Sequence, residues 1–132
     1  MSESIDLEHI AQEWGHHPVE AFVALGEGLR HASKQLGRDR SRGADRHLSA
    51  EELVLGIVDV LIERCGMLAR SVLRSWNIHS ADDVGAITFH LIDCGVLGKQ
   101  ENDHPEDFRN LPPLAEIIHQ RLRQHIDKSL SR

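Results

Sequence analysis

The sequence has little of several things, and each shortage excludes a class of protein. Tyrosine is absent and the 132 residues include two tryptophans and three phenylalanines, so a single-stranded nucleic-acid surface of stacked aromatic rings is not expected. Two cysteines cannot make the disulfide framework of a small secreted domain. No apolar run approaches the ~18–20 residues of a membrane span, and residues 1–14 do not resemble a signal peptide. We therefore expect a cytoplasmic protein without a membrane segment.

Motifs for catalysis and cofactor binding are also lacking. The chain has no G-x-S-x-G nucleophile elbow, and Gly-Glu-Gly at 26–28 is neither a P-loop nor a dinucleotide fingerprint. His90 and Cys94 lie four residues apart on a predicted helix, but zinc needs three or four ligands and no third one follows at a telling spacing. We therefore predict no catalytic residue, no cofactor and no metal site. A metal-binding protein or metalloenzyme stays open as an alternative.

Helical periodicity is the feature that the sequence does have, almost throughout its length. The composition, 40% hydrophobic and 27% charged, is ordinary for a globular protein, and the length fits a single domain over 1–132. Apolar residues at helical spacing predict helices over about 5–14, 18–36, 49–65, 67–76, 80–94 and 112–130. The predicted fold class is therefore mainly α, a single domain of five or six helices.

Local signals mark where several of these helices begin and end. Ser49 and Glu52 form a capping-box pattern, and Ser80 stands three residues before Asp83 in the same way. Asn77 suits the left-handed position that ends a helix. These signals depend on residues close together in the chain, so we expect them to hold in the folded protein.

The order of these elements also matches a winged helix. Residues 67–76 would be the supporting helix, 80–94 would take the recognition position, and one short β-hairpin near 96–111 would be the wing. The first turn of 80–94 is Ser-Ala-Asp-Asp, whose carboxylates would repel phosphates, so such a domain is better suited to contact protein than DNA. The alternative is a plain helical bundle with an irregular acidic loop.

Charge is distributed in blocks along the chain. The formal net charge is -6, yet residues 30–46 carry +4 and residues 109–132 carry +3. The candidate partner-binding residues are Arg38, Arg40, Arg42 and Arg46 in the basic loop 38–46 and Asp103 and Asp107 in the acidic loop. Ten histidines fall on predicted caps, loops and polar faces and do not converge on a site. Because histidine titrates near pH 6.5, surface charge should change between about pH 7 and 5.5.

A set of residues over 18–108 resembles a small family of uncharacterised conserved bacterial proteins, of the planctomycete and verrucomicrobial type. The matching positions are Pro18 to Phe22, Glu27 to Leu29, His47 to Ser49, Glu52, Leu53, Gly56, Ile57, Gly66 to Ala69, Val72, Leu73, Trp76, Ile78, Asp83 to Gly85, Phe89, Leu91, Gly98, Lys99, Asp103 and Glu106 to Phe108. Asn77 departs from the pattern, in which a glycine stands there, and His90 and Cys94 also depart from it. The resemblance implies a bacterial cytoplasmic protein and assigns no chemistry.

These observations favour a non-enzymatic protein–protein interaction module that binds an unidentified protein or a second copy of itself. The first alternative is a nucleic-acid-binding, winged-helix-like protein that uses the basic loop 38–46.

Overall fold

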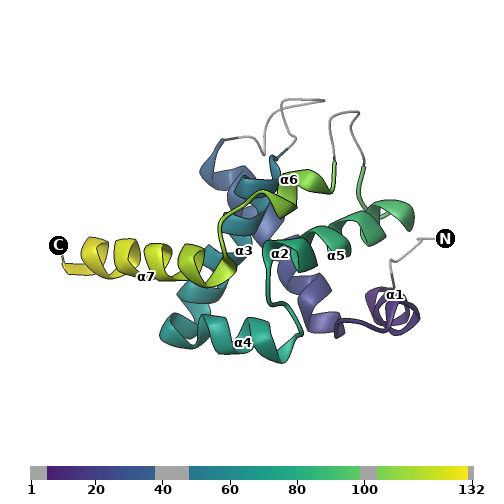
Figure 1. Ribbon diagram of the computed structural model, residues 1–132, viewed down its shortest axis with the longest axis horizontal. Coiled ribbons are helices and arrows are strands. Elements are labelled where there is room, and N and C mark those ends of the chain that lie inside the picture. The colour runs from purple at the N-terminus through teal and green to yellow at the C-terminus, as the bar shows by residue number, and fades with distance from the viewer. Residues whose placement is uncertain (1–5, 38–47, 99–103, 131–132) are drawn as a thin grey trace.

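The computed structural model describes residues 6–37, 48–98 and 104–130, and all regular structure in these ranges is helical (Figure 1). The elements are α1 (Leu7–Trp14), α2 (Val19–Gln35), α3 (Ala50–Cys65), the 3-10 turn η2 (Gly66–Leu68), α4 (Ala69–Ser75), α5 (Ala81–Asp93), α6 (Glu106–Arg109) and α7 (Leu114–Leu130). The prediction of a mainly helical protein is confirmed. Within the same ranges, no helix has the length and apolar content that crossing a membrane requires.

The centre of the molecule is the pair of helices α2 and α3, on which the other helices pack (Figure 1). Phe22 and Leu25 of α2 and Val54 and Val58 of α3 are almost fully buried. Burial of each such side chain stabilises the fold by about 1.5–3 kcal/mol. At the surface, the Arg64 guanidinium donates to both carboxylate oxygens of Glu27, which links the two helices by an ion pair.

The predicted helix ends are confirmed where local signals specified them. The Ser49 hydroxyl accepts from Glu52 N at 3.1 Å, and Glu52 Oε1 accepts from Ser49 N at 2.8 Å, which completes a capping box. Ser80 and Asp83 form a second capping box at α5. Asn77 has a φ of 62°, and Ile78 N donates to Leu73 O, so α4 ends in the left-handed motif expected for asparagine.

The predicted hairpin near 96–111 is not found in the described residues, and its return strand is wrong. Glu106–Arg109 form the short helix α6, and Phe108 is buried among helices because its ring packs on Gly85 of α5. At the other end, Val96 N donates to Leu91 O, so Val96 terminates α5 instead of starting a strand. The helix predicted over 67–76 is also shorter, because its first residues belong to η2.

Apolar residues at helical spacing predicted the last helix over 112–130, and only its first half has buried residues. Leu114, Ile117 and Ile118 are buried, whereas every residue of α7 beyond Leu122 is exposed. The second half of α7 therefore extends away from the body of the molecule (Figure 1).

Candidate functional site

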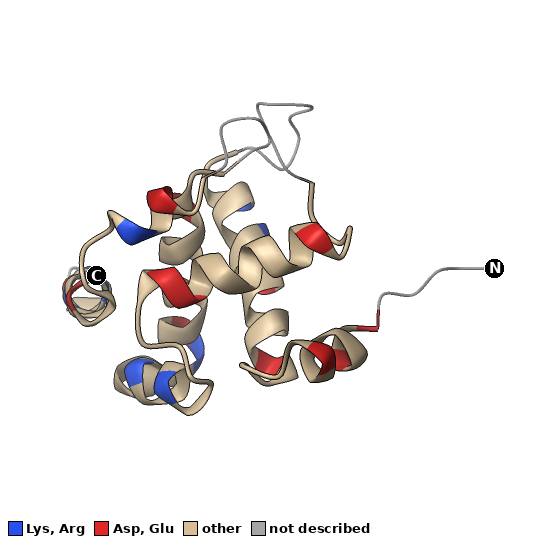
Figure 2. Cartoon of the chain, turned by 45° about the vertical axis from the view of Figure 1, so that its right-hand side comes forward, with Lys and Arg blue, Asp and Glu red and all other residues tan. Residues whose placement is uncertain are grey.

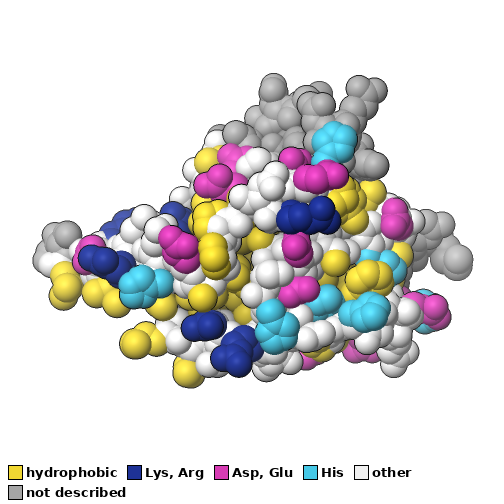
Figure 3. Space-filling model, in the orientation of Figure 1, with side chains coloured by type: hydrophobic (Ala, Val, Ile, Leu, Met, Phe, Trp, Pro, Cys, Tyr) yellow, Lys and Arg dark blue, Asp and Glu magenta, His cyan; other side chains and the backbone are white. Residues whose placement is uncertain are grey.

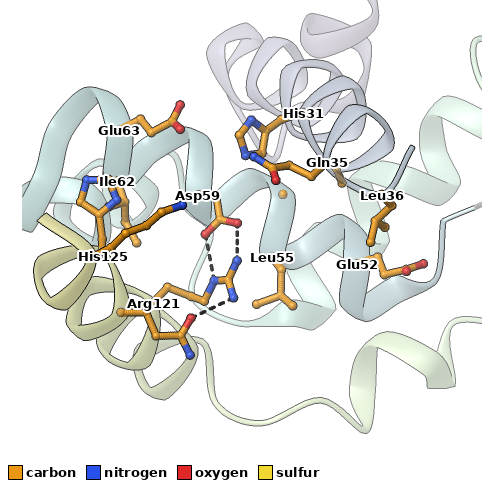
Figure 4. Close-up of a pocket in the computed structure, with 14 residues that line it drawn as sticks. His31, Gln35, Leu36, Glu52, Leu55, Asp59, Ile62, Glu63, Arg121 and His125 are labelled. Carbon is orange, nitrogen blue, oxygen red and sulfur yellow. Dashed lines mark hydrogen bonds and ion pairs between the residues drawn. The ribbon is translucent and has the colours of Figure 1, made fainter. Parts of the chain in front are cut away.

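A groove of about 390 Å³ lies between the second half of α7 and the paired helices α2 and α3 (Figure 4). His31 comes from α2, Asp59 and Glu63 come from α3, and Arg121 and His125 come from α7. Residues 30–37 are the described part of the basic segment 30–46. The groove brings them close to the basic C-terminal segment, 109–132.

The strongest interaction in this groove is the ion pair between Asp59 and Arg121. Arg121 Nε donates to Asp59 Oδ1 at 2.9 Å, and a terminal guanidinium nitrogen donates to Oδ2 at 2.5 Å. A second terminal nitrogen donates to Gln124 Oε1 at 3.1 Å. The hydrogen bond to Asp59 raises the pKa of Arg121 above its ordinary value. These hydrogen bonds anchor α7 to α3. Because the two charges neutralise each other, neither group is available to bind a charged ligand.

Beside this groove, the molecule has an apolar surface at the free end of α7 and at the corner between α3 and α4. The exposed fractions are 48% for Ile126, 79% for Leu130, 81% for Met67 and 65% for Leu68. Figure 3 shows hydrophobic side chains along the lower edge of the extended helix and on the part of the molecule beneath it. We call these four residues, with the half-buried Leu122, the apolar end surface.

The candidate partner-binding residues are mostly not tested by the structure. Arg38, Arg40, Arg42, Arg46 and Asp103 lie outside the described residues.

Asp107 is exposed, and its Oδ2 accepts from His104 N at 3.4 Å. This contact lies at the start of α6, where a carboxylate stabilises the first turn of a helix. Asp107 therefore makes a local contact with the backbone that precedes α6.

Figure 2 shows acidic side chains on several helices on both sides of the molecule and basic side chains together on α4. Acidic residues such as Glu8 and Glu13 lie on α1, and Arg70 and Arg74 lie on α4.

Four histidines come together where the α1–α2 connection meets the start and end of α5. The rings of His16, His17 and His90 surround Trp14, with centroid distances to the indole of 4.8, 6.4 and 4.4 Å. His79 joins them through Asn77, whose Nδ2 donates to His16 O at 3.1 Å and whose Oδ1 lies 3.0 Å from His79 Nε2. We call Trp14, His16, His17, His79 and His90 the histidine junction.

This cluster was not predicted from the sequence, in which the ten histidines do not converge on a site. The local signal was that His16 and His17 precede the predicted start of one helix, and His79 directly precedes the Ser80 cap of another. Their contact depends on packing between segments about sixty residues apart, and no local pattern reports that.

His90 and Cys94 do approach each other, with 3.7 Å between His90 Nε2 and Cys94 Sγ. The His90 ring stacks on Trp14, and Cys94 is exposed at the end of α5. Among the residues that the structure describes, no group of three or more histidine, cysteine, aspartate or glutamate side chains is placed to hold a metal ion.

Comparison of the chain with protein-family models, with curated proteins and with solved structures found no match.

Proposed function

We propose that this protein is a non-enzymatic protein–protein interaction module that self-associates through its apolar end surface. The observation that supports the proposal is an apolar stripe on a helix that leaves the body of the molecule, in which Ile126 and Leu130 are exposed and Leu122 is half-buried. Contiguous exposed apolar side chains on an otherwise polar protein are typical of interaction sites. The resemblance to an uncharacterised bacterial family and the cytoplasmic location belong to the same proposal and add no chemistry to it.

The extended half of α7 is a poor candidate for a stable element on its own. Isolated helices shorter than about 12–15 residues are marginal in water, and the residues beyond Leu122 have no buried face. A second helix packed on the stripe would bury Ile126 and Leu130 and stabilise this half. Met67 and Leu68, at the nearby corner, would extend the apolar area.

A second copy of the same helix fits this stripe. When two α7 helices pack antiparallel about Ile126, Leu122 of each lies opposite Leu130 of the other, so the stripe is self-complementary. In this register Lys128 lies opposite Gln124, and Asp127 lies opposite His125. The arrangement places no like charges directly opposite each other, which supports a symmetric pair over an unrelated basic or acidic helix.

The test is the concentration dependence of the mass in solution, measured by analytical ultracentrifugation. The wild type is expected to shift from monomer to dimer as concentration rises, because association follows mass action. The double variant Ile126→Glu, Leu130→Glu should stay monomeric, and any loss of helix content should be confined to the second half of α7. Val23→Glu is the matched control, because Val23 is an exposed apolar residue of α2 and its replacement should leave the dimer intact. A wild type that is monomeric at every concentration would overturn the proposal.

The nucleic-acid-binding, winged-helix-like alternative depends on the basic loop 38–46, and no described residue favours it over the interaction module. Salt-dependent retention on DNA or RNA that is lost when Arg38, Arg40, Arg42 and Arg46 are replaced would favour this alternative.

A further inference from the structure

His17 is the buried member of the histidine junction. His17 is 8% exposed. Its Nδ1 accepts a hydrogen bond from Trp14 Nε1 at 2.9 Å. Its Nε2 is buried and has no hydrogen-bond partner among the residues that the structure describes. Because the indole N–H can only donate, Nδ1 must be unprotonated and the proton of the neutral ring is on Nε2.

A second proton on His17 would have to be placed on Nδ1. This proton would remove the acceptor of the Trp14 hydrogen bond. It would also make the N–H of Trp14 Nε1 and the N–H of His17 Nδ1 point at each other. It would also leave a cation whose Nε2–H has no acceptor, and a buried charge without full hydrogen bonding is costly. The neutral ring is therefore the form that the packed junction accepts.

The groups around His17 come from three segments of the chain. His16 precedes it, His79 approaches from the turn between α4 and α5, and Asp83 stands in the first turn of α5. Burial lowers the pKa of His17 below 6.5, and the neighbouring His16 and His79 lower it further. The Asp83 carboxylate and the Asn77 backbone act in the opposite direction, although no hydrogen bond of ordinary geometry forms at Nε2.

We propose that the histidine junction is a pH-sensitive latch, in which protonation of His17 releases Trp14 and thereby undocks α1 from the rest of the fold. The geometry supports α1 as the element that moves. It is eight residues long and has one buried residue, Ala11, and it packs chiefly on α2. A helix of this length does not persist without tertiary contacts, so loss of the Trp14 contacts should also unwind it.

The direction of the response follows from the two states of His17. In the undocked state the ring is solvated and titrates near 6.5, whereas in the docked state its pKa lies lower. The undocked state therefore binds more protons as pH falls below about 6.5, and α1 is docked at pH 8 and released progressively in acid.

The test follows Trp14 between pH 8 and pH 5 in the full-length protein. Trp76→Phe leaves Trp14 as the single indole reporter, because the chain has two tryptophans. Undocking predicts a shift of indole emission to longer wavelength and loss of protection of the Trp14 Nε1 proton against exchange with solvent. The midpoint should lie below pH 6.5, and the amides of α3 should keep their protection.

His17→Asn in the same background is the decisive variant. The asparagine Oδ1 can accept from the Trp14 indole in place of Nδ1, yet the side chain does not titrate. The variant should keep α1 docked at pH 8 and lose the acid transition. His9→Asn is the matched control, because His9 is an exposed histidine on α1, and it should retain the transition.

Three outcomes would overturn the latch. They are an unchanged Trp14 signal down to pH 5, the same transition in His17→Asn, or a transition in which α3 loses protection together with α1. If His17→Asn does not fold, NMR titration of the His17 ring in the wild type decides. A ring pKa at or above 6.5 contradicts the proposal, and a lower one that coincides with the Trp14 midpoint supports it.

Discussion

Two glycines allow α2 and α3 to approach as closely as they do. A Cβ atom on Gly28 would lie 2.7 Å from Ile57 N and 2.8 Å from Ile57 Cα. A Cβ atom on Gly56 would lie 2.9 Å from Ala32 Cβ and closer still to Gly28 O. Backbone atoms cannot move aside as a flexible side chain can, so this helix crossing requires glycine at both positions.

Replacing Gly56 with alanine should therefore force the two central helices apart. We expect Gly56→Ala to lower the free energy of unfolding by about 3 kcal/mol, the upper part of the range for overpacked cores. Gly26→Ala is the matched control, because the nearest atom to its Cβ is a flexible Arg30 nitrogen at 3.8 Å. The control should raise stability by roughly 0.5–1 kcal/mol, since alanine favours a helix interior over glycine. Urea denaturation of both variants would measure the difference, and equal effects would contradict the close crossing.

At the scale of single helices, the helix ends are stabilised mainly by contacts between residues a few positions apart in the chain. The capping boxes at Ser49 and Ser80 satisfy backbone N–H groups that the first turn leaves without a helical partner. At the other ends, Gly37, Gly66 and Gly95 have positive φ, which suits the residue that follows a helix. The helices therefore have boundaries that do not depend on their neighbours.

Ser49→Ala should destabilise the protein through the start of α3. Loss of the hydroxyl that accepts from Glu52 N should cost about 1 kcal/mol. Ser71→Ala serves as the control, because Ser71 is exposed in α4 and is not its N-cap residue, which is Leu68. That change should be neutral or slightly stabilising. Thermal unfolding followed by circular dichroism compares them, and a Ser49→Ala protein as stable as Ser71→Ala would contradict the role of the cap.

At the scale of the whole molecule, the direction of α7 depends on its connection to α3. Leu114, Ile117 and Ile118 bury its first half, and the ion pair of Arg121 with Asp59 is the last strong contact before the helix becomes exposed. This pair therefore decides where the exposed half of α7, with Ile126 and Leu130, is held.

Asp59→Asn should loosen α7 without unfolding the domain. Removing the carboxylate charge weakens both hydrogen bonds from Arg121, and we expect a loss of about 1–2 kcal/mol for this partly exposed pair. Amide exchange in the second half of α7 should accelerate, while α2 and α3 stay protected.

Glu63→Gln is the matched control, because Glu63 lines the same groove and points away from Arg121 (Figure 4). It should leave exchange in α7 unchanged. Equal acceleration in both variants would show that general charge, and not this pair, holds the helix.

The sequence by itself determined the helical class and most helix boundaries. Hydrophobic periodicity, the capping boxes and the left-handed Asn77 are local properties, set by residues three to five positions apart, so they hold whatever the remainder of the chain does. The prediction from sequence was wrong near 96–111, where the pattern placed Phe108 in a strand and the structure has the helix α6. The burial of its ring against Gly85 is a tertiary contact that overrides local pattern.

Only the tertiary structure decided which residues form sites. Asn77 and His16 are 61 positions apart and Arg121 and Asp59 are 62. The first contact depends on how the α1–α2 connection meets the turn between α4 and α5, and the second depends on how α7 packs on α3. The same packing assembled three dispersed histidines around Trp14 and joined a fourth, His79, through Asn77. It left Ile126 and Leu130 exposed on α7. Periodicity shows which residues share a face of a helix. How much of that face is buried depends on how far the neighbouring helices extend along it.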